Sequence, residues 1–240
     1  MSKKYPKASK HGEIEEVFDN VFLVRGSAAM GPGMRISRNM TIIREGTSLT
    51  LICTIRLNEE GLQKLDALGK VEHVVKLGDY HLDFKNGMDD PFYLDRYQAK
   101  YWAMPGMTHN NGVETTHPMT PGGELPFSGA SLFSYETSKR PEGLLLLEHE
   151  GGILISADSL QNWEADDFFS PIAKLIVRLG GYFRPANVGP AWRKKCQPQA
   201  SDFARVKALN FRHLIPSHGK PIKNTARKDF TKTFKELYGV

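Results

Sequence analysis

The sequence predicts a mixed α/β protein in which two β-sheets pack face to face and helices cover the outside. Three observations favour this architecture. Strand-like runs occur in pairs joined by short Gly-containing turns, at 40–53 and again at 144–155. A helical segment follows each pair. The order also lacks the strict strand–helix alternation of a doubly wound parallel sheet.

The first half of the chain contains most of the predicted strands. A helix interrupts them, with Asn58 as its expected N-cap and Gly69 as its expected end. Residues 26–33, which are rich in Gly, Ala and Met, are predicted to form a loop, as is the long Pro-, Gly- and Thr-rich segment 105–130. The predicted strands of this half are 21–24, 40–44, 49–53, 73–77 and 98–103.

The second half repeats this style with one further hairpin and three helical segments. Residues 159–181 are predicted to be mainly helical, because their large apolar residues recur at helical spacing. That stripe is expected to face the core and consists of Ile172, Leu175, Ile176 and Leu179. Ser201 is the expected cap of the next helix, 213–216 is a predicted short strand, and 225–237 is a predicted terminal helix.

The chain reads as one domain with a short N-terminal extension. Residues 1–12 are polar and basic and are expected to be a disordered arm. No stretch of linker composition divides residues 13–240, which are therefore predicted to form a single domain.

Charge and hydropathy narrow the function classes. The formal net charge is +5, and the excess lies in the N-terminal arm and in 220–235, which we interpret as solvated ends, so no nucleic-acid partner is expected. No run approaches the ~18 apolar residues of a membrane span. No apolar segment of a secretory signal follows the N-terminal lysines, which favours a cytoplasmic protein. The two cysteines form no C-x-x-C pair, which excludes a thiolate zinc knuckle.

Several His and Asp residues come directly after predicted strands. Asp79, His81 and Asp83 follow the strand that ends at Leu77, Asp158 follows 153–157, and His218 follows 213–216. Rigid strand ends can hold such side chains around one point, and imidazole and carboxylate are ligands for zinc, iron or manganese. Each residue taken alone also has an ordinary interpretation, as a turn residue, a packed histidine or a helix cap.

This layout resembles the metallo-β-lactamase-fold superfamily, from about Val17 to the C-terminus. Three segments carry the resemblance: 77–84 occupies the place of the H-x-H-x-D-H motif, 155–158 is similar to the strand that ends in Gly-Asp, and 214–219 is similar to the closing strand that delivers the last His. The resemblance implies a four-layer αββα sandwich. It also implies a metal-dependent hydrolase, or less often an oxidoreductase, with one or two zinc, iron or manganese ions.

The carry-over of the motif is incomplete. Asp79, His81, Asp83 and Phe84 fall on the four positions of H-x-H-x-D-H, and Phe84 cannot bind a metal. The mid-chain His of the family falls on Gly123 of Pro121-Gly122-Gly123, so that the nearby His117 is the substitute we expect. Cys53 stands where the family usually has an Asp, either as a buried apolar residue or as a thiol near the metal.

The expected ligand set is therefore divergent, with Asp158 and His218 as its best matches. The candidate metal ligands are Asp79, His81, Asp83, His117, Asp158 and His218, and the resemblance implies Asp83 as the catalytic residue. The loss of two imidazoles favours one ion over two, and the added carboxylates shift the preference from zinc towards iron or manganese. An alternative alignment makes Asp89 and Asp90 the acidic pair of the motif.

Two functions follow from this reading. The first is a metal-dependent, hydrolase-like protein that acts on a small molecule at a degenerate, mononuclear site. The second is a pseudoenzyme, a protein of the same architecture that binds a ligand or a partner without turnover and needs no metal. The aromatic segment 80–102 would either wall a pocket or simply belong to the core.

Overall fold

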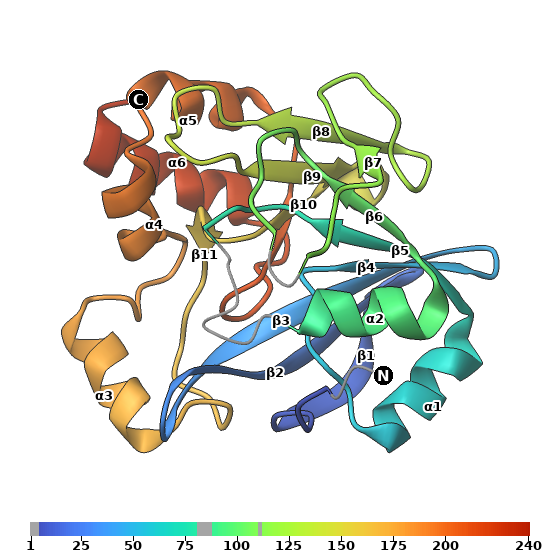
Figure 1. The fold of residues 1–240 in the computed structure, drawn as a ribbon. Coiled ribbons are helices and arrows are strands. Elements are labelled where there is room, and N and C mark those ends of the chain that lie inside the picture. Colours follow the sequence, from blue (N-terminus) through green and yellow to red (C-terminus); the bar gives the residue numbers. More distant parts are fainter. Residues whose placement is uncertain (1–4, 81–87, 110–111) are drawn as a thin grey trace.

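The chain forms two β-sheets that lie face to face, with a helical layer outside each (Figure 1). The computed structural model describes residues 5–80, 88–109 and 112–240. The first sheet has seven strands in sequence order, antiparallel from β1 to β4 and parallel from β4 to β7. These strands are β1 (His11–Phe18), β2 (Val21–Gly31), β3 (Met34–Glu45), β4 (Ser48–Ile52), β5 (Lys70–Lys76), β6 (Lys100–Ala103) and β7 (His117–Pro118).

The second sheet has four strands in the order β13-β10-β9-β8. Its neighbours are antiparallel except for β10 and β13, which pair in parallel from Ile153 opposite His213 to Ser156 opposite Pro216. A separate two-stranded ribbon pairs β11 with β12. The strands are β8 (Ala130–Ser134), β9 (Gly143–Leu147), β10 (Ile153–Ser156), β11 (Leu160–Gln161), β12 (Asn187–Val188) and β13 (His213–Pro216).

Helices cover the outer face of each sheet and complete the αββα sandwich. Leu65 of α1 and Tyr93 of α2 pack with Leu51 on the outside of the first sheet. Phe203 of α5 and Phe230 of α6 pack with the second sheet. The helices are α1 (Glu59–Leu68), α2 (Asp89–Tyr97), α3 (Pro171–Leu179), α4 (Pro190–Cys196), α5 (Ala200–Ala208) and α6 (Ala226–Tyr238), with a 3-10 turn at His149–Gly151.

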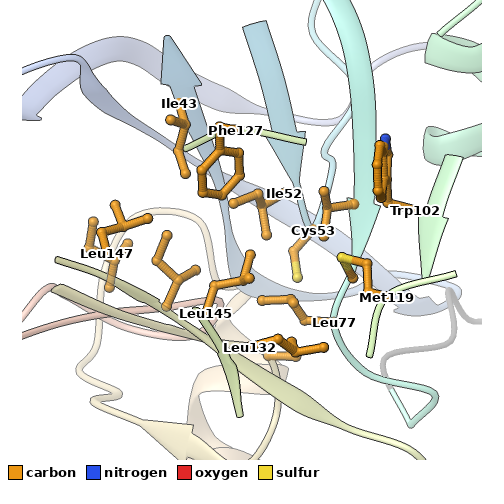
Figure 2. Packing of buried hydrophobic residues seen from close by; sticks show 14 of the residues in the cluster. Ile43, Ile52, Cys53, Leu77, Trp102, Met119, Phe127, Leu132, Leu145 and Leu147 are labelled. Carbon is orange, nitrogen blue, oxygen red and sulfur yellow. The ribbon is translucent and has the colours of Figure 1, made fainter. Parts of the chain in front are cut away.

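The main core lies between the two sheets. Ile52 of β4 and Leu77, directly after β5, meet Leu145 and Leu147 of β9, and all four side chains are almost completely buried (Figure 2). At about 25 cal/mol per Å² of apolar surface, this burial between the sheets is a major contribution to the stability of the fold.

Most of the predicted elements are confirmed. The hairpin β9–β10, the strand β13 and the helix α6 lie close to their predicted bounds, and the hairpin β3–β4 is present, although β3 begins at Met34 rather than at the predicted Met40. Helix α1 begins as predicted, since the Asn58 side chain accepts a hydrogen bond from the Gly61 N–H at 2.8 Å. The cap of α5 is Gln199 rather than Ser201.

Two predicted elements are wrong. Residues 26–33 are the end of a long β2–β3 hairpin, in which Ala29 pairs with Arg35 and Gly31 with Met34. Within 159–181 only α3 is helical, and its predicted core stripe faces outward. The exposed fractions are 61% for Ile172, 58% for Leu175, 50% for Ile176 and 79% for Leu179. The smaller Ala173 and Val177 are the buried residues of this helix.

The N-terminal segment differs from the expected disordered arm in its described part. Strand β1 already begins at His11, and the Lys10 carbonyl accepts a hydrogen bond from the Ser27 N–H at 2.8 Å. The Tyr5 hydroxyl donates to the Pro91 carbonyl at 3.1 Å, and the Tyr5 ring packs edge-on against Phe92. Hydrogen bonds thus hold residues 5–10 at both ends.

None of the helices in the described part of the chain has the length and the apolar composition that a membrane span requires.

Candidate metal site

Asp158 and His218 reach the same edge of the second sheet because their strands are parallel and in register. The last pair of β10 and β13 is Ser156 with Pro216, so each of the two residues lies two positions beyond it. The chain must then turn sharply after His218. Gly219 has a φ of +91°, and a Cβ there would lie 1.8 Å from the Asn162 carbonyl oxygen, so that only glycine fits.

The two side chains face each other. Nε2 of His218 lies 3.3 Å from Oδ1 of Asp158, and both residues are almost completely buried. Nδ1 of His218 lies 2.9 Å from the carbonyl oxygen of Ser37 on β3. Because a carbonyl oxygen only accepts, Nδ1 carries a hydrogen, and Nε2 is the ring nitrogen that faces the Asp158 carboxylate.

The pair fits two ligands of one metal ion. With bonds of ~2.0–2.2 Å and tetrahedral angles, adjacent donors of a zinc site lie about 3.4 Å apart, close to the observed 3.3 Å. The bond from Nδ1 to a backbone carbonyl is the arrangement that usually orients a metal-binding histidine. The donor types, one imidazole and one carboxylate, suit zinc, iron or manganese.

Both residues line a cavity of about 330 Å³. Its polar lining includes Arg38 of β3, Asp89 at the start of α2 and Gln161 of β11, whose amide nitrogen donates to the Asp158 carbonyl at 2.8 Å. Asn39 of β3 links the two sheets near the cavity. Its amide nitrogen donates hydrogen bonds to the carbonyls of Pro216 at 2.8 Å and Gly219 at 2.6 Å.

Further ligands for the pair are not found among the described residues, where no group of three or more His, Cys, Asp or Glu side chains is suited to a metal ion. His81, Asp83 and Phe84 lie outside these residues. Of the alternative acidic pair, Asp89 lines the cavity, whereas Asp90 accepts hydrogen bonds from the hydroxyls of Thr54 at 2.5 Å and Tyr101 at 2.7 Å.

Asp79 lies just past the end of β5, but its carboxylate interacts with residues of neighbouring loops. Oδ1 accepts from the Thr108 N–H at 2.6 Å, and Oδ2 lies 3.7 Å from the Arg140 guanidinium. Asp79 is not among the residues that line the cavity around Asp158 and His218. The next residue, Tyr80, does line it.

His117 lies on β7 at the edge of the first sheet. Its ring packs on Trp102 with 4.6 Å between ring centroids, and its Nδ1 is 2.9 Å from the Thr116 hydroxyl. His117 is likewise absent from the cavity lining. Among the described candidates, the structure therefore brings together Asp158 and His218, and places Asp79 and His117 elsewhere.

Cys53 is buried in the core between the sheets, beside Ile52 and Leu77 (Figure 2). Its backbone has a φ of +54°. Burial raises the pKa of the Cys53 thiol to about 11, even though a hydrogen bond with Ser217 and the charge of Arg38 act in the opposite direction. Of the two roles considered for this residue, the structure favours the buried apolar one.

Glu142 is a site residue that the sequence reasoning missed. It is completely buried, and its Oε1 accepts from the Ser159 N–H at 2.6 Å, one residue after Asp158. Burial raises the pKa of Glu142 well above its usual value, and the nearby Asp158 carboxylate raises it further. Its one sequence signal is a carboxyl group placed directly before the apolar run 143–147. Through its hydrogen bond with the Ser159 N–H, Glu142 supports the turn that carries Asp158.

Solved structures resemble the chain along almost its entire length. VMB-1 superposes with a TM-score of 0.65 at 14% identity, over 96% of this chain and 99% of that chain. The metallo-β-lactamase FIM-1 from Pseudomonas aeruginosa, crystallised in a mono-zinc form, gives 0.63 at 14% identity, over 96% and 97%. A metallo-β-lactamase from Hirschia baltica gives 0.58 at 16% identity, over 92% and 97%.

At the level of sequence the likeness is weak. No protein-family model matches the chain, and neither does any curated protein sequence. At sequence identities of 14–16%, these superpositions show a similar fold and nothing more. The two facing sheets and the two helical layers agree with that likeness, and the protein has the metallo-β-lactamase fold.

Proposed function

We propose that the chain is a metal-dependent hydrolase that acts on a small molecule and holds one ion between His218 and Asp158. The observation that carries this proposal is the 3.3 Å separation of Nε2 and Oδ1 inside a cavity, with Nδ1 bonded to a backbone carbonyl. His81 and Asp83 remain the proposed further ligands, with Asp83 also the proposed catalytic residue. The mono-zinc form of FIM-1 supports a single ion in a site of this fold.

A bound zinc, iron or manganese ion would supply a water acidified towards neutral pH. Other residues of the chain orient and position the two candidate ligands. The Ser37 carbonyl fixes the ring orientation and tautomer of His218. Gln161 and Glu142 both bind the peptide group that joins Asp158 to Ser159, and so hold the backbone directly after the Asp158 side chain. The surrounding sheets and Trp163, whose ring lies 4.8 Å from that of His218, limit the access of water.

The metal content of purified protein tests this proposal. Protein purified without chelator from metal-supplemented cells should contain about one ion per chain. His218→Ala and His81→Ala should each lower that content, whereas the exposed His149→Ala should not. Wild-type protein with less than about 0.2 ion per chain, or equal metal in all three variants, would contradict the proposed site.

A binding protein without turnover is the second candidate. It is favoured by the use of Asp79, which falls on a ligand position of the family motif, as a partner of the Thr108 backbone and Arg140. A folded protein that binds small molecules but contains no metal and hydrolyses no ester or amide would support this candidate over the hydrolase.

A further inference from the structure

The cavity has a polar group of lining residues, Asp158, His218 and Gln161, and an apolar wall. The wall begins at Trp163, beside His218, and continues through a packed cluster that includes Phe169, Ala173 and Val177. Tyr182 contacts the same indole, with 5.5 Å between ring centroids. Of these residues Trp163, Ala173, Val177 and Tyr182 line the cavity, so its apolar wall extends from beside His218 to α3.

Helix α3 and the end of the β2–β3 hairpin form the far part of this wall. Ile176 and Val177 of α3 line the cavity together with Met30 and Met34 of the hairpin. Figure 1 shows α3 beside the turn of that hairpin, apart from the other helices. Hydrogen bonds fix this arrangement, because Ser170 donates its N–H to the Arg35 carbonyl at 3.0 Å and accepts the Arg35 N–H at 3.1 Å.

This part of the wall contains aliphatic and thioether side chains, which adapt their shape to flexible apolar groups. Asp158, His218 and Gln161 lie together in another part of the lining, which also includes the polar residues Lys7, Ser9 and Ser27. A molecule that fills the cavity therefore needs a polar group at one end and an apolar chain at the other. The volume of about 330 Å³ is within the range of small-ligand pockets.

Trp163 lies between the Asp158–His218 pair and the apolar wall, and it adds a requirement for the ligand. Its side chain is 7% exposed, and its Nε1–H has no acceptor among the described residues. A buried donor without an acceptor costs about 1–3 kcal/mol, so a ligand that supplies an acceptor there is favoured. A carbonyl oxygen is such an acceptor, and it would lie beside the proposed hydrolytic site.

We propose that the cavity binds an aliphatic acyl compound, an ester or amide of a straight-chain carboxylic acid. Its chain lies along Ile176, Val177 and Met34, and its carbonyl oxygen accepts from Trp163. This inference rests on the proposed function for the reaction but not for the binding. Hydrolysis of the ester would add one water to the carbonyl carbon, break the acyl C–O bond and release the acid and the alcohol.

Calorimetric titration with a homologous series tests the binding without metal or turnover. The probes are the N-methylamides of straight-chain acids from butanoic to decanoic, which are neutral and slow to hydrolyse. The Kd of the wild type should fall about 4-fold per added methylene until the wall is covered, the value expected for burial of one CH₂ group. A Kd that stays constant within about 2-fold along the series would overturn the proposal.

Two variants of α3 form a matched pair. Ile176→Asp should weaken binding of the decanoyl amide at least about 10-fold and reduce its advantage over the butanoyl amide. Leu179→Asp, with the same charge on the same helix but outside the cavity lining, should leave both unchanged. Both side chains are exposed by half or more, so both variants are expected to fold. An equal loss in the two variants would contradict the assigned wall.

Trp163→Phe tests the carbonyl contact. It should weaken the binding of every amide by about 2- to 10-fold and leave the dependence on chain length intact. An unchanged Kd would overturn the contact with Trp163. Failure of the two proposals can be told apart: metal-free protein that retains the chain-length dependence contradicts the hydrolase alone, and metal-loaded protein without that dependence contradicts this inference alone.

Discussion

Asp79 holds Thr108 in place: its Oδ1 accepts the Thr108 N–H at 2.6 Å, and Lys76 donates to the Thr108 carbonyl at the same distance. Both side chains come from the end of β5. Their hydrogen bonds connect the long segment between β6 and β7 to the first sheet. A residue that the family motif places among the metal ligands thus has a structural role here.

Asp79→Ala should lower the free energy of unfolding by about 1–3 kcal/mol, because the Thr108 N–H loses a charged acceptor. The bound metal per chain should stay at the wild-type value. Urea unfolding and metal analysis of the same sample check both, with the exposed Asp167→Ala as the control. Loss of metal from the folded Asp79→Ala variant would return Asp79 to the ligand set.

Glu142→Gln should stabilise the protein increasingly as the pH rises. Burial raises the pKa of Glu142 above the value of 4.5 expected for the unfolded chain, so the folded wild type retains a proton that the unfolded chain releases. The stability that this proton gives is full below about pH 4.5 and is lost as the pH rises towards the folded-state pKa. Gln keeps the acceptor for the Ser159 N–H and does not titrate.

The gain of Glu142→Gln over the wild type should therefore grow by up to about 1.4 kcal/mol per pH unit above pH 4.5. Urea unfolding at about pH 5 and pH 8 measures it. Glu148→Gln, at an exposed site, is the matched control. The same difference between variant and wild type at both pH values would show that Glu142 is not held neutral.

Neither cysteine should react with thiol reagents in the folded protein. Burial raises the pKa of Cys53 to about 11 and that of Cys196 to about 12. At pH 8 only about one Cys53 in a thousand is then a thiolate, the reactive form. Labelling with a disulfide reagent should be slow in buffer and reach both thiols in urea. Rapid labelling of Cys53 in the native state would contradict its place in the core.

Substitutions on the two faces of α3 should differ in their effect on stability. Leu179→Gln should change the free energy of unfolding by less than about 0.5 kcal/mol, since the Leu179 side chain is 79% exposed. Val177→Ala should lower it by about 1.5–3 kcal/mol through lost burial and a cavity. Chemical unfolding of both variants checks this orientation of the helix, and a larger loss for Leu179→Gln would reverse it.

The sequence predicts elements whose signals are local. The hairpin turns, the Asn58 cap and the position of His218 after an apolar strand depend on neighbouring residues, and they are where the structure has them. The end of the β2–β3 hairpin was missed because Gly26, Ala28 and Ala29 have low strand propensity. Their pairing with residues of β3 determines their conformation instead.

Side-chain placement is less predictable, because it depends on residues far away in the chain. Helical spacing identifies an apolar stripe on α3, but not which side the protein covers, and here the small Ala173 and Val177 face inward. Glu142 gains its role from Ser159 and Asp158, which arrive from a different strand. The Asp158–His218 pair could be predicted from the sequence, because each residue directly follows a strand and the two strands are parallel neighbours.

Asn39 joins β3 to the chain around His218, and Ser37 on the same strand orients the His218 ring. These contacts cross from one sheet to the other, so neither half of the sandwich contains all the residues of the proposed metal centre by itself. During folding, the centre acquires its geometry when the two sheets dock and not earlier. Occupancy by an ion would then act as a reporter of native assembly, and separated fragments of the two halves would regain it only by associating.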